Sequence, residues 1–586
     1  MGSTGPVRWS PVPSTEAGAD RGSARIRSPG EGALVVLLAF VGYLAAAAVL
    51  VLGAGVIQPD ALSRVANASY VLFSRDPHLA AIGFVWNPLP SLLELPLLPF
   101  ATVWPVLLRL GFAANVVSAV SMALAVGQVR GILADLGLRR AVRLLLTALF
   151  ALHPMIVAYA ANGMSEAPFL LFLLAAVRQL GRWFTLGSIR GLALGGVALG
   201  IAYLVRYEAA AAALGAVGVV GLEAYRRAVV PARERLYAAA ADAVVVFAPV
   251  ALAVGSWALA SWVIVGNPFE TFVSIYGNSS QVAIGSADIR AATGQGLAQV
   301  GGYAVRQIAG LEPSIAPLAI VAVLVALRRR DQLAIPALTV LAFAIFGSVL
   351  AFAGWALVTG RLAGWLRYQI VVVPLAVILA GAVAAAVAAA VGQASRDGLA
   401  RRDAFVRRLA STALLLATIA GLAVALPGAT GAMRDPVLGR GEAAYLAALE
   451  AALDPTADQG AGTAIRDQFA SGMAAAGYLD SLDLPDGAVL LDSASGFAVV
   501  LASGRPRQFA ITPDRDFREL LADPVTFGLH YLLVQVDCPL DAVARRYPTL
   551  ASDGAGIATL VREFGSASPG CYTGAWRLYR VGAPAT

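Results

Sequence analysis

The sequence predicts a mainly α-helical protein that crosses a membrane about eleven times and carries a soluble α/β domain at its C-terminal end. Of its 586 residues, 59% are hydrophobic and only 13% are charged, whereas a soluble globular chain has about 25% charged residues. The arginines fall in short clusters between long apolar runs, as in the loops between membrane spans. Beyond about residue 429 the apolar runs shorten, and Asp and Gly become more frequent.

The net charge of +7 is compatible with nucleic-acid binding as well as with membrane topology. The alternation of arginine clusters with apolar runs is better explained by the positive-inside rule. We therefore expect no nucleic-acid partner.

Residues 1–31 are rich in Gly, Pro, Ser and Arg, which predicts a disordered cytoplasmic tail. The first apolar run, at about 32–57, is longer than the core of a cleaved signal peptide and long enough to cross a bilayer. We expect an uncleaved first span with its N-terminus in the cytoplasm.

The segment 58–111 is expected to be a large first external loop. Its second half, 87–111, is apolar but contains five prolines, which interrupt helical hydrogen bonding. We expect short helices lying at the membrane interface here. The alternative, a true span, would reverse the side of every later loop.

The positions of the arginines decide between these alternatives. With no span at 87–111, five arginine clusters fall on one side of the membrane, which the positive-inside rule identifies as the cytoplasm. Residues 32–428 then form the transmembrane domain, the C-terminus is external, and Asp76 is external. The later spans are expected near 112–130, 141–158, 167–182, 191–205, 208–225, 238–264, 312–327, 333–357, 369–393 and 409–428.

Residues 429–586 are expected to form an extracytoplasmic α/β domain of about 150 residues. Its β-like runs lie at 488–492, 497–501, 531–535 and 576–580, and a helical pattern lies at 441–453. The two cysteines of the chain, Cys538 and Cys571, both lie in this domain. In an oxidising compartment a disulfide is the simplest interpretation, and two unpaired buried thiols are the alternative.

Four sets of polar residues fall on the external side in this topology. The first comprises Arg75, Asp76 and His78, with Glu94 further along the same loop. Charged groups beside a membrane segment need water, a partner or a ligand. The set is therefore a candidate site, and an ordinary solvated loop is the alternative.

The second and third sets lie at the external ends of spans. Glu166 begins a helix in the segment NGMSEAP, where the helix dipole alone favours an acid. Arg206 and Glu208 lie at the ends of adjacent spans, where a structural ion pair is an equally good interpretation.

The fourth set comprises Arg361, Arg367 and Tyr368, just before a late span. Interfacial Arg and Tyr commonly anchor helices, but these arginines stand against the charge bias of their side. A guanidinium can donate two hydrogen bonds to a phosphate, and a nearby carboxylate can accept the proton of an attacking hydroxyl. Sugar transfer from a lipid phosphate requires both a cation that binds the phosphate and a carboxylate that accepts the proton.

On these features the chain resembles the GT-C superfamily of membrane glycosyltransferases, and is similar to the bacterial aminoarabinose transferases and protein O-mannosyltransferases. The resembling features are Asp76 in the first external loop, the proline-rich helices, Glu166 after the third span, Arg367 with Tyr368, and the C-terminal domain. The chain has SRDPH where many relatives show an Asp-Glu pair.

The resemblance implies an inverting transferase at the external face of the plasma membrane. It would move a sugar from a polyprenyl-phosphate donor to a glycan, lipid or protein acceptor of the cell envelope. No cofactor is required, and a divalent metal is left open. The implied roles are Asp76 as general base, His78 and Glu166 as its helpers or orienting groups, and Arg75, Arg206, Glu208, Arg361, Arg367 and Tyr368 as substrate- and phosphate-binding residues.

Two other classes remain as alternatives. A transporter or flippase of a lipid-linked glycan would move membrane lipids without chemistry, and a non-catalytic assembly factor would bind partners through its external domain. A transporter places ionisable residues near the membrane midplane, whereas here the charges gather at one face.

The predicted topology is tested by fusing a reporter enzyme after residue 430. A reporter that is active only after export should be active, because the arginine clusters hold the opposite loops in the cytoplasm. Activity of a cytoplasm-only reporter at the same position would contradict the topology and place Asp76 on the wrong face.

Overall fold

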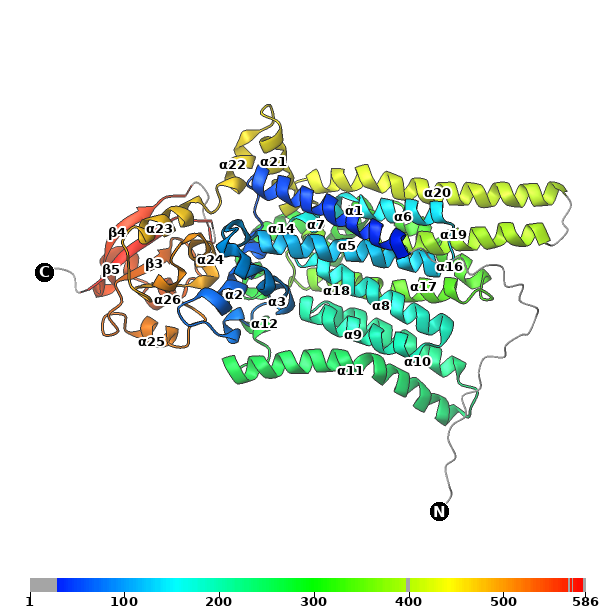
Figure 1. Ribbon diagram of the computed structural model, residues 1–586, viewed down its shortest axis with the longest axis horizontal. Coiled ribbons are helices and arrows are strands. Elements are labelled where there is room, and N and C mark those ends of the chain that lie inside the picture. Colours follow the sequence, from blue (N-terminus) through cyan, green and yellow to red (C-terminus); the bar gives the residue numbers. More distant parts are fainter. Residues whose placement is uncertain (1–28, 397–400, 567–569, 572, 583–586) are drawn as a thin grey trace, which may run out of the picture.

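The computed structural model describes residues 29–396, 401–566, 570–571 and 573–582. The molecule is elongated, with a body of long helices at one end and a domain containing a β-sheet at the other (Figure 1). Nearly all of the predicted tail, 1–31, lies outside the described residues.

Within the described residues, eight helical segments are long and apolar enough to cross a membrane, and two bent pairs raise the number to ten. The chain is therefore a multi-pass membrane protein. The eight segments are α1 (Pro29–Ala47) with η1 (Ala48–Gly53), α5 (Phe112–Asp135), α8 (Glu166–Leu186), α10 (Ala209–Arg227), α11 (Ala232–Val265), α17 (Ala334–Ala342) with η4 (Phe343–Gly347) and α18 (Ser348–Val358), η5 (Leu366–Gln369) with α19 (Val372–Arg396), and α20 (Arg401–Arg434).

The bent pairs are α6 (Arg140–Ala151) with α7 (Pro154–Ala161), at 60°, and α15 (Gly296–Leu311) with α16 (Ile315–Arg328), at 80°. Pro154 and Pro313 lie at the two breaks, and proline interrupts helical hydrogen bonding. A further predicted span, 191–205, is helix α9 (Ile189–Val205), which has 17 residues, at the lower limit of what crosses a bilayer.

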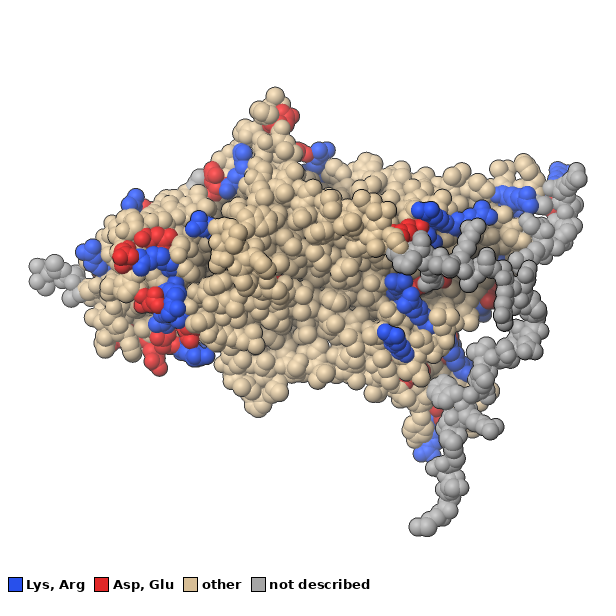
Figure 2. Space-filling view, viewed as in Figure 1, with Lys and Arg blue, Asp and Glu red and all other residues tan. Residues whose placement is uncertain are grey.

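The helical body presents a broad band without charged side chains to the view of Figure 2, between charged regions at its two ends. A lipid-facing surface requires this pattern, since a charge in hydrocarbon is costly. Inside the body, small residues let helices approach. A Cβ on Gly215 would lie 1.9 Å from the carbonyl oxygen of Ala344 on η4, so close packing of α10 depends on this glycine.

The first loop is helical for most of its length. Helix α2 begins with Pro59 at its first position, which suits a residue without an N–H, and it buries Leu62 and Val65. The proline-rich segment forms three short helices, as its prolines predict. The elements of the loop are α2 (Pro59–Phe73), η2 (Leu79–Ile82), α3 (Leu89–Glu94), η3 (Leu95–Thr102) and α4 (Val106–Arg109).

A second loop, between α11 and α15, reaches the C-terminal domain. Its short helices are α12 (Glu270–Val273), α13 (Asn278–Ile284) and α14 (Ser286–Thr293). Between the first two, the hydroxyl of Tyr276 donates a hydrogen bond of 2.9 Å to Asp492. The loop is thereby tied to the sheet domain.

The C-terminal region contains a five-stranded mixed sheet of order β2-β1-β3-β5-β4. Strands β2, β1 and β3 are parallel, and β5 is antiparallel to both β3 and β4. The prediction of a helical membrane body followed by an α/β region is confirmed. The strands are β1 (Val489–Leu491), β2 (Phe509–Ile511), β3 (Tyr531–Gln535), β4 (Ala558–Phe564) and β5 (Trp576–Val581), and the other elements are α21 (Gly441–Leu453), α22 (Gln459–Arg466), α23 (Ala470–Asp480), α24 (Ser493–Ala502), η6 (Pro506–Gln508), α25 (Phe517–Ala522), α26 (Ala542–Arg546), α27 (Leu550–Asp553) and η7 (Gly554–Gly556).

The predicted strand at 497–501 is wrong, because these residues lie in helix α24. Parallel neighbours β1 and β2 need a crossover connection, and α24 supplies it. Asp492 caps the helix by accepting a hydrogen bond of 2.9 Å from the N–H of Ala494. The β-branched pair Val499–Val500 misled the prediction, since burial on all sides suits a helix as well as a strand.

Ion pairs join the first loop to the sheet domain. Arg75 lies 3.0 Å from Asp514 and also contacts Asp516, and Asp76 lies 3.1 Å from Arg515. Burial raises the pKa of Asp514 to about 6, although Arg75 opposes the shift. Arg75 and Asp76 of the first loop thus meet charges of the opposite sign in residues 514–516.

Cys538 and Cys571 form a disulfide that closes a loop across 33 positions of the chain. Replacing both by serine should lower the free energy of unfolding by about 2–4 kcal/mol, because the unfolded chain regains the entropy of that loop. Denaturant unfolding of the whole protein measures the loss. Mass spectrometry of unreduced peptides should find the two cysteines joined, and alkylatable thiols in protein from its native membrane would contradict the pairing.

Candidate functional site

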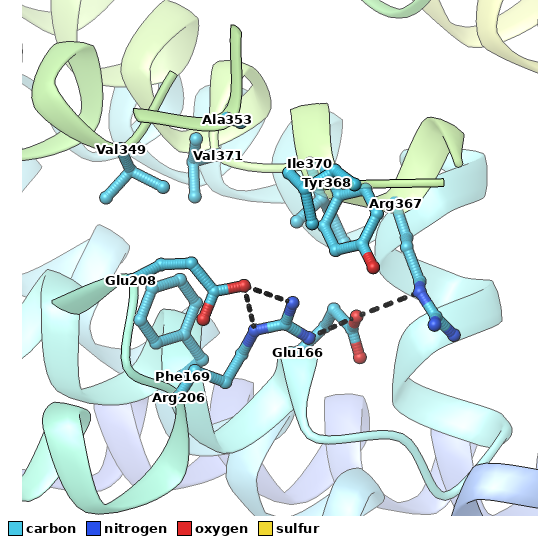
Figure 3. A pocket seen from close by; sticks show the side chains of 11 residues that line it. Glu166, Phe169, Arg206, Glu208, Val349, Ala353, Arg367, Tyr368, Ile370 and Val371 are labelled. Carbon is cyan, nitrogen blue, oxygen red and sulfur yellow. Dashed lines mark hydrogen bonds and ion pairs between the residues drawn. The ribbon is translucent and has the colours of Figure 1, made fainter. Parts of the chain in front are cut away.

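Arg206 lies at the centre of a charged cluster where three helices meet (Figure 3). It follows α9 directly, Glu166 begins α8, and Glu208 immediately precedes α10. Its guanidinium lies 2.6 Å from Glu166 and 2.6 Å from Glu208, and all three side chains are largely shielded from solvent. The cluster therefore joins the ends of three helices through one buried cation.

Arg367 lies on the other side of Glu166, in η5. Its Nη2 is 3.1 Å from Asp60 of α2, and its Nε is 3.8 Å from Glu166. The guanidinium also lies 3.9 Å from the centre of the Trp365 ring, a favourable cation–π arrangement. One face of the cation is thus covered by an aromatic ring, while its edge meets two carboxylates.

Glu442 of α21 holds the backbone that carries Arg367. Its Oε1 accepts hydrogen bonds from the N–H of Arg367 at 3.1 Å and from the hydroxyl of Tyr159 at 2.5 Å. Burial raises the pKa of Glu442. Glu442 is not among the residues that line the cavities described below, so it is a positioning residue for η5.

Arg64 is a third guanidinium beside these residues, one helical turn after Asp60 on α2. Its side chain is buried, and the guanidinium lies 5.8 Å from the centre of the Trp86 ring. Among the described residues it has no ion pair, and its hydrogen bond, to the sulfur of Met164 at 4.0 Å, is to a weak acceptor. Burial lowers the pKa of this guanidinium, as expected for a cation held away from water.

A buried cation without a carboxylate partner is costly. The cost falls when an anion enters, because a charge-assisted hydrogen bond then replaces the missing one. Arg64 lines a small cavity of about 50 Å³ together with Asp60, Arg206 and Arg367. These four side chains can therefore surround a small anionic group.

A much larger cavity, of about 900 Å³, adjoins this pocket and shares Asp60, Trp86 and Gln281 with it. Its size is that of a ligand-binding cleft. Its walls come from α2, the loop after it, the loop between α11 and α15, and the sheet domain. The polar residues on its walls include Asp60, His78, Glu270, Tyr276, Arg515, Arg518 and Arg545.

Asp60 is the carboxylate at the junction of the two cavities. Its side chain is 29% exposed, against 1% for Glu166 and 6% for Glu208. Of these three acids, Asp60 can best reach a ligand. The sequence does hold a signal for it: Asp60 and Arg64 are polar residues one turn apart on a helix that otherwise buries apolar side chains.

The structure brings together five of the residues predicted from the sequence around a pocket of about 10 Å³ that adjoins the 50 Å³ cavity. They are Glu166, Arg206, Glu208, Arg367 and Tyr368. The Tyr368 ring lies between the two arginines, with its centre 5.7 Å from the Arg206 guanidinium and 5.6 Å from that of Arg367.

The other predicted residues lie elsewhere. Both carboxylate oxygens of Asp76 accept hydrogen bonds from Arg515, and Nδ1 of His78 is 2.7 Å from the backbone oxygen of Asp76. Arg75 is engaged by the acids of the sheet domain. Arg361 is exposed and lies over Trp355, at 5.5 Å. Among the described residues, no group of three or more His, Cys, Asp or Glu side chains is placed to hold a metal ion.

Comparison with known proteins finds likeness of structure alone. No protein-family profile and no curated protein matches the sequence. The structure is similar to the crystal structure of ArnT from Cupriavidus metallidurans bound to undecaprenyl phosphate, with 14% sequence identity, a TM-score of 0.49, and coverage of 94% of this chain and 98% of that one. The apo state of the same protein gives 15% identity, a TM-score of 0.48 and the same coverage. At this identity and TM-score the likeness assigns no role to any side chain.

Proposed function

We propose that this protein is a membrane glycosyltransferase that moves a sugar from a polyprenyl-phosphate donor to an acceptor hydroxyl on the external face of the membrane. The observation that carries the proposal is the cluster of Arg64, Arg206 and Arg367 around a small cavity, with Asp60 between it and a cavity large enough for an acceptor.

The phosphate of the donor would bind Arg64 and Arg367. Arg64 makes no ion pair among the described residues, and its hydrogen bond is to the sulfur of Met164. Arg367 has its nearest carboxylate, Asp60, at 3.1 Å and Glu166 at 3.8 Å. Arg206 is already held by two carboxylates at 2.6 Å, so its role is to keep the pocket in shape. The polyprenyl chain would leave the pocket toward the lipid-facing surface.

Asp60 is our candidate for the general base. When the phosphate takes the guanidinium of Arg367, the carboxylate of Asp60 loses that partner and is free to accept a proton. The acceptor oxygen then bonds to the anomeric carbon from the face opposite the phosphate. The bond from that carbon to the phosphate oxygen breaks, its electron pair leaves with the phosphate, and the hydroxyl proton passes to Asp60.

Asp76, the base expected from the sequence, stays in the proposal as the competing assignment. Its two oxygens contact Arg515, a residue of the sheet domain that is exposed at the cavity wall. In this position Asp76 and His78 are better suited to shaping the acceptor cavity than to removing a proton next to the phosphate.

A transporter of lipid-linked sugars is the second candidate, and one observation favours it. The breaks of the two bent pairs meet, with Nε2 of His153 lying 4.0 Å from Oε1 of Glu312, and both side chains are buried. Broken helices with ionisable residues at the break are typical of transporters. Sugar transfer to an acceptor, measured directly, separates the two functions.

Asp60→Asn should lower sugar transfer by about 10²–10⁴-fold, because the amide keeps the shape but cannot accept the proton. Asp76→Asn is the matched variant and should retain most of the activity. The measurement is transfer from a radiolabelled polyprenyl-phosphate sugar in proteoliposomes. If Asp76→Asn lost sugar transfer and Asp60→Asn retained it, the general base would be Asp76. Movement of the lipid without cleavage of the sugar–phosphate bond would establish the transporter.

Arg64→Gln should weaken binding of the donor by about 10- to 100-fold, which corresponds to the loss of one charged hydrogen bond to the phosphate. Arg361→Gln serves as the control, since Arg361 is exposed and outside the pocket. Equilibrium binding of the labelled donor to purified variants gives the affinities. Equal donor affinity in Arg64→Gln and wild type would remove Arg64 from the phosphate site.

A further inference from the structure

Another cavity opens on the lipid-facing side of the helical body, between α1 and α5. It has a volume of about 620 Å³. Leu37 of α1 and Leu124 of α5 line it and are 56% and 43% exposed, so the groove is open to the surrounding lipid. The rest of its apolar wall consists of Ala33, Val36, Phe40, Val120, Ala123 and Gly127.

Two arginines and a glutamine close one end of the groove: Arg130, Arg178 and Gln128 line it there, beside Gly32 at the start of α1. A Cβ at Gly131 would lie 2.3 Å from the Arg178 guanidinium carbon. This glycine therefore leaves room for the end of the Arg178 side chain of α8 against α5.

The cations at this end outnumber the carboxylates that hold them. Glu31 accepts ion pairs from Arg130, Arg140 and Arg143, each at 2.8 Å. Asp135 lies 3.1 Å from Arg178 and 3.2 Å from Arg182. Five guanidinium groups therefore face two carboxylates, and the end of the groove keeps a surplus of positive charge next to an apolar channel.

We propose that this groove binds an anionic phospholipid, with an acyl chain between α1 and α5 and the phosphate against Arg130 and Arg178. The apolar wall matches an acyl chain, and the surplus cations match a headgroup with net negative charge. Figure 2 shows arginine side chains gathered at this end of the helical body, opposite the sheet domain. The groove lies away from the proposed donor pocket, so the inference is independent of the proposed function.

The probe is phosphatidylglycerol, compared with zwitterionic phosphatidylcholine, and bound lipid is counted by native mass spectrometry of the whole protein released from mixed micelles. Wild type should retain phosphatidylglycerol in preference. Arg178→Gln should lower its retention by about fivefold, the effect of one cation near an anionic lipid. Leu124→Trp should lower it similarly, because the indole fills the channel while leaving every charge in place.

Two control variants match these changes outside the groove. Arg226→Gln removes a cation of α10, and Leu252→Trp adds an indole to an exposed face of α11. Both should retain lipid as wild type does. Equal retention of the two lipids by wild type would overturn the proposal. The proposal would also be overturned if Leu124→Trp retained phosphatidylglycerol as wild type does, even if Arg178→Gln lost it. The acyl chain would then not lie in the groove, and surface charge alone would hold the headgroup.

Discussion

The position of Arg206 between Glu166 and Glu208 is the interaction on which the rest of the pocket depends. A cation shielded from solvent needs partners at hydrogen-bond distance, and here both lie at 2.6 Å and come from different helix ends. Removing one partner of a buried ion pair costs about 3–5 kcal/mol, because the other charge stays buried. The ends of α8, α9 and α10 are therefore fixed relative to one another, and Glu166 in turn fixes the distance to Arg367.

Glu166, Arg206, Glu208, Arg367 and Tyr368 were predictable because each stands at the end of an apolar segment. Topology brings such ends to one side of the membrane, so residues up to 200 positions apart meet there without any local signal of contact. The membrane body was predictable because the bilayer places the same demand on every span. Each span must be apolar, and the arginines gather in the loops on one side of the membrane.

What the sequence could not show is which polar residue of the first loop turns toward the pocket. Asp76 sits in the most polar stretch of the loop, yet its partner, Arg515, lies 439 positions away. Asp60 lies in the first turn of α2, and only the packing of α2 places it beside Arg367. The bent spans were hidden as well, since Glu312 and His153 interrupt apolar runs whose composition still resembles straight helices.

Arg64 and Arg367 differ in what each must give up to bind an entering anion. Arg64 is buried and makes no ion pair among the described residues, although Asp60, Glu166 and Glu94 attract it from a distance. An entering anion can therefore accept hydrogen bonds from its guanidinium without displacing a carboxylate. Arg367 must exchange one anion for another, so its net gain is smaller, but the exchange changes the state of Asp60. If the donor binds as proposed, its phosphate takes Arg367 from Asp60, and Asp60 can then accept the proton of the acceptor. In the empty site, Asp60 stays paired with Arg367.

The hydrogen bond from Tyr276 to Asp492 has a consequence for the sheet domain. In open α/β sheets, ligands bind beyond the carboxyl ends of the strands, where neighbours lead away in opposite directions. Here that point is the end of β1, between β2 and β3, and Asp492 follows β1 directly. The side chain of Tyr276, from the loop between α11 and α15, donates its hydrogen bond to Asp492 at this point. The carboxyl end of β1 is therefore contacted by Tyr276, and the residues that follow β1 and β2 form part of the wall of the shared cavity.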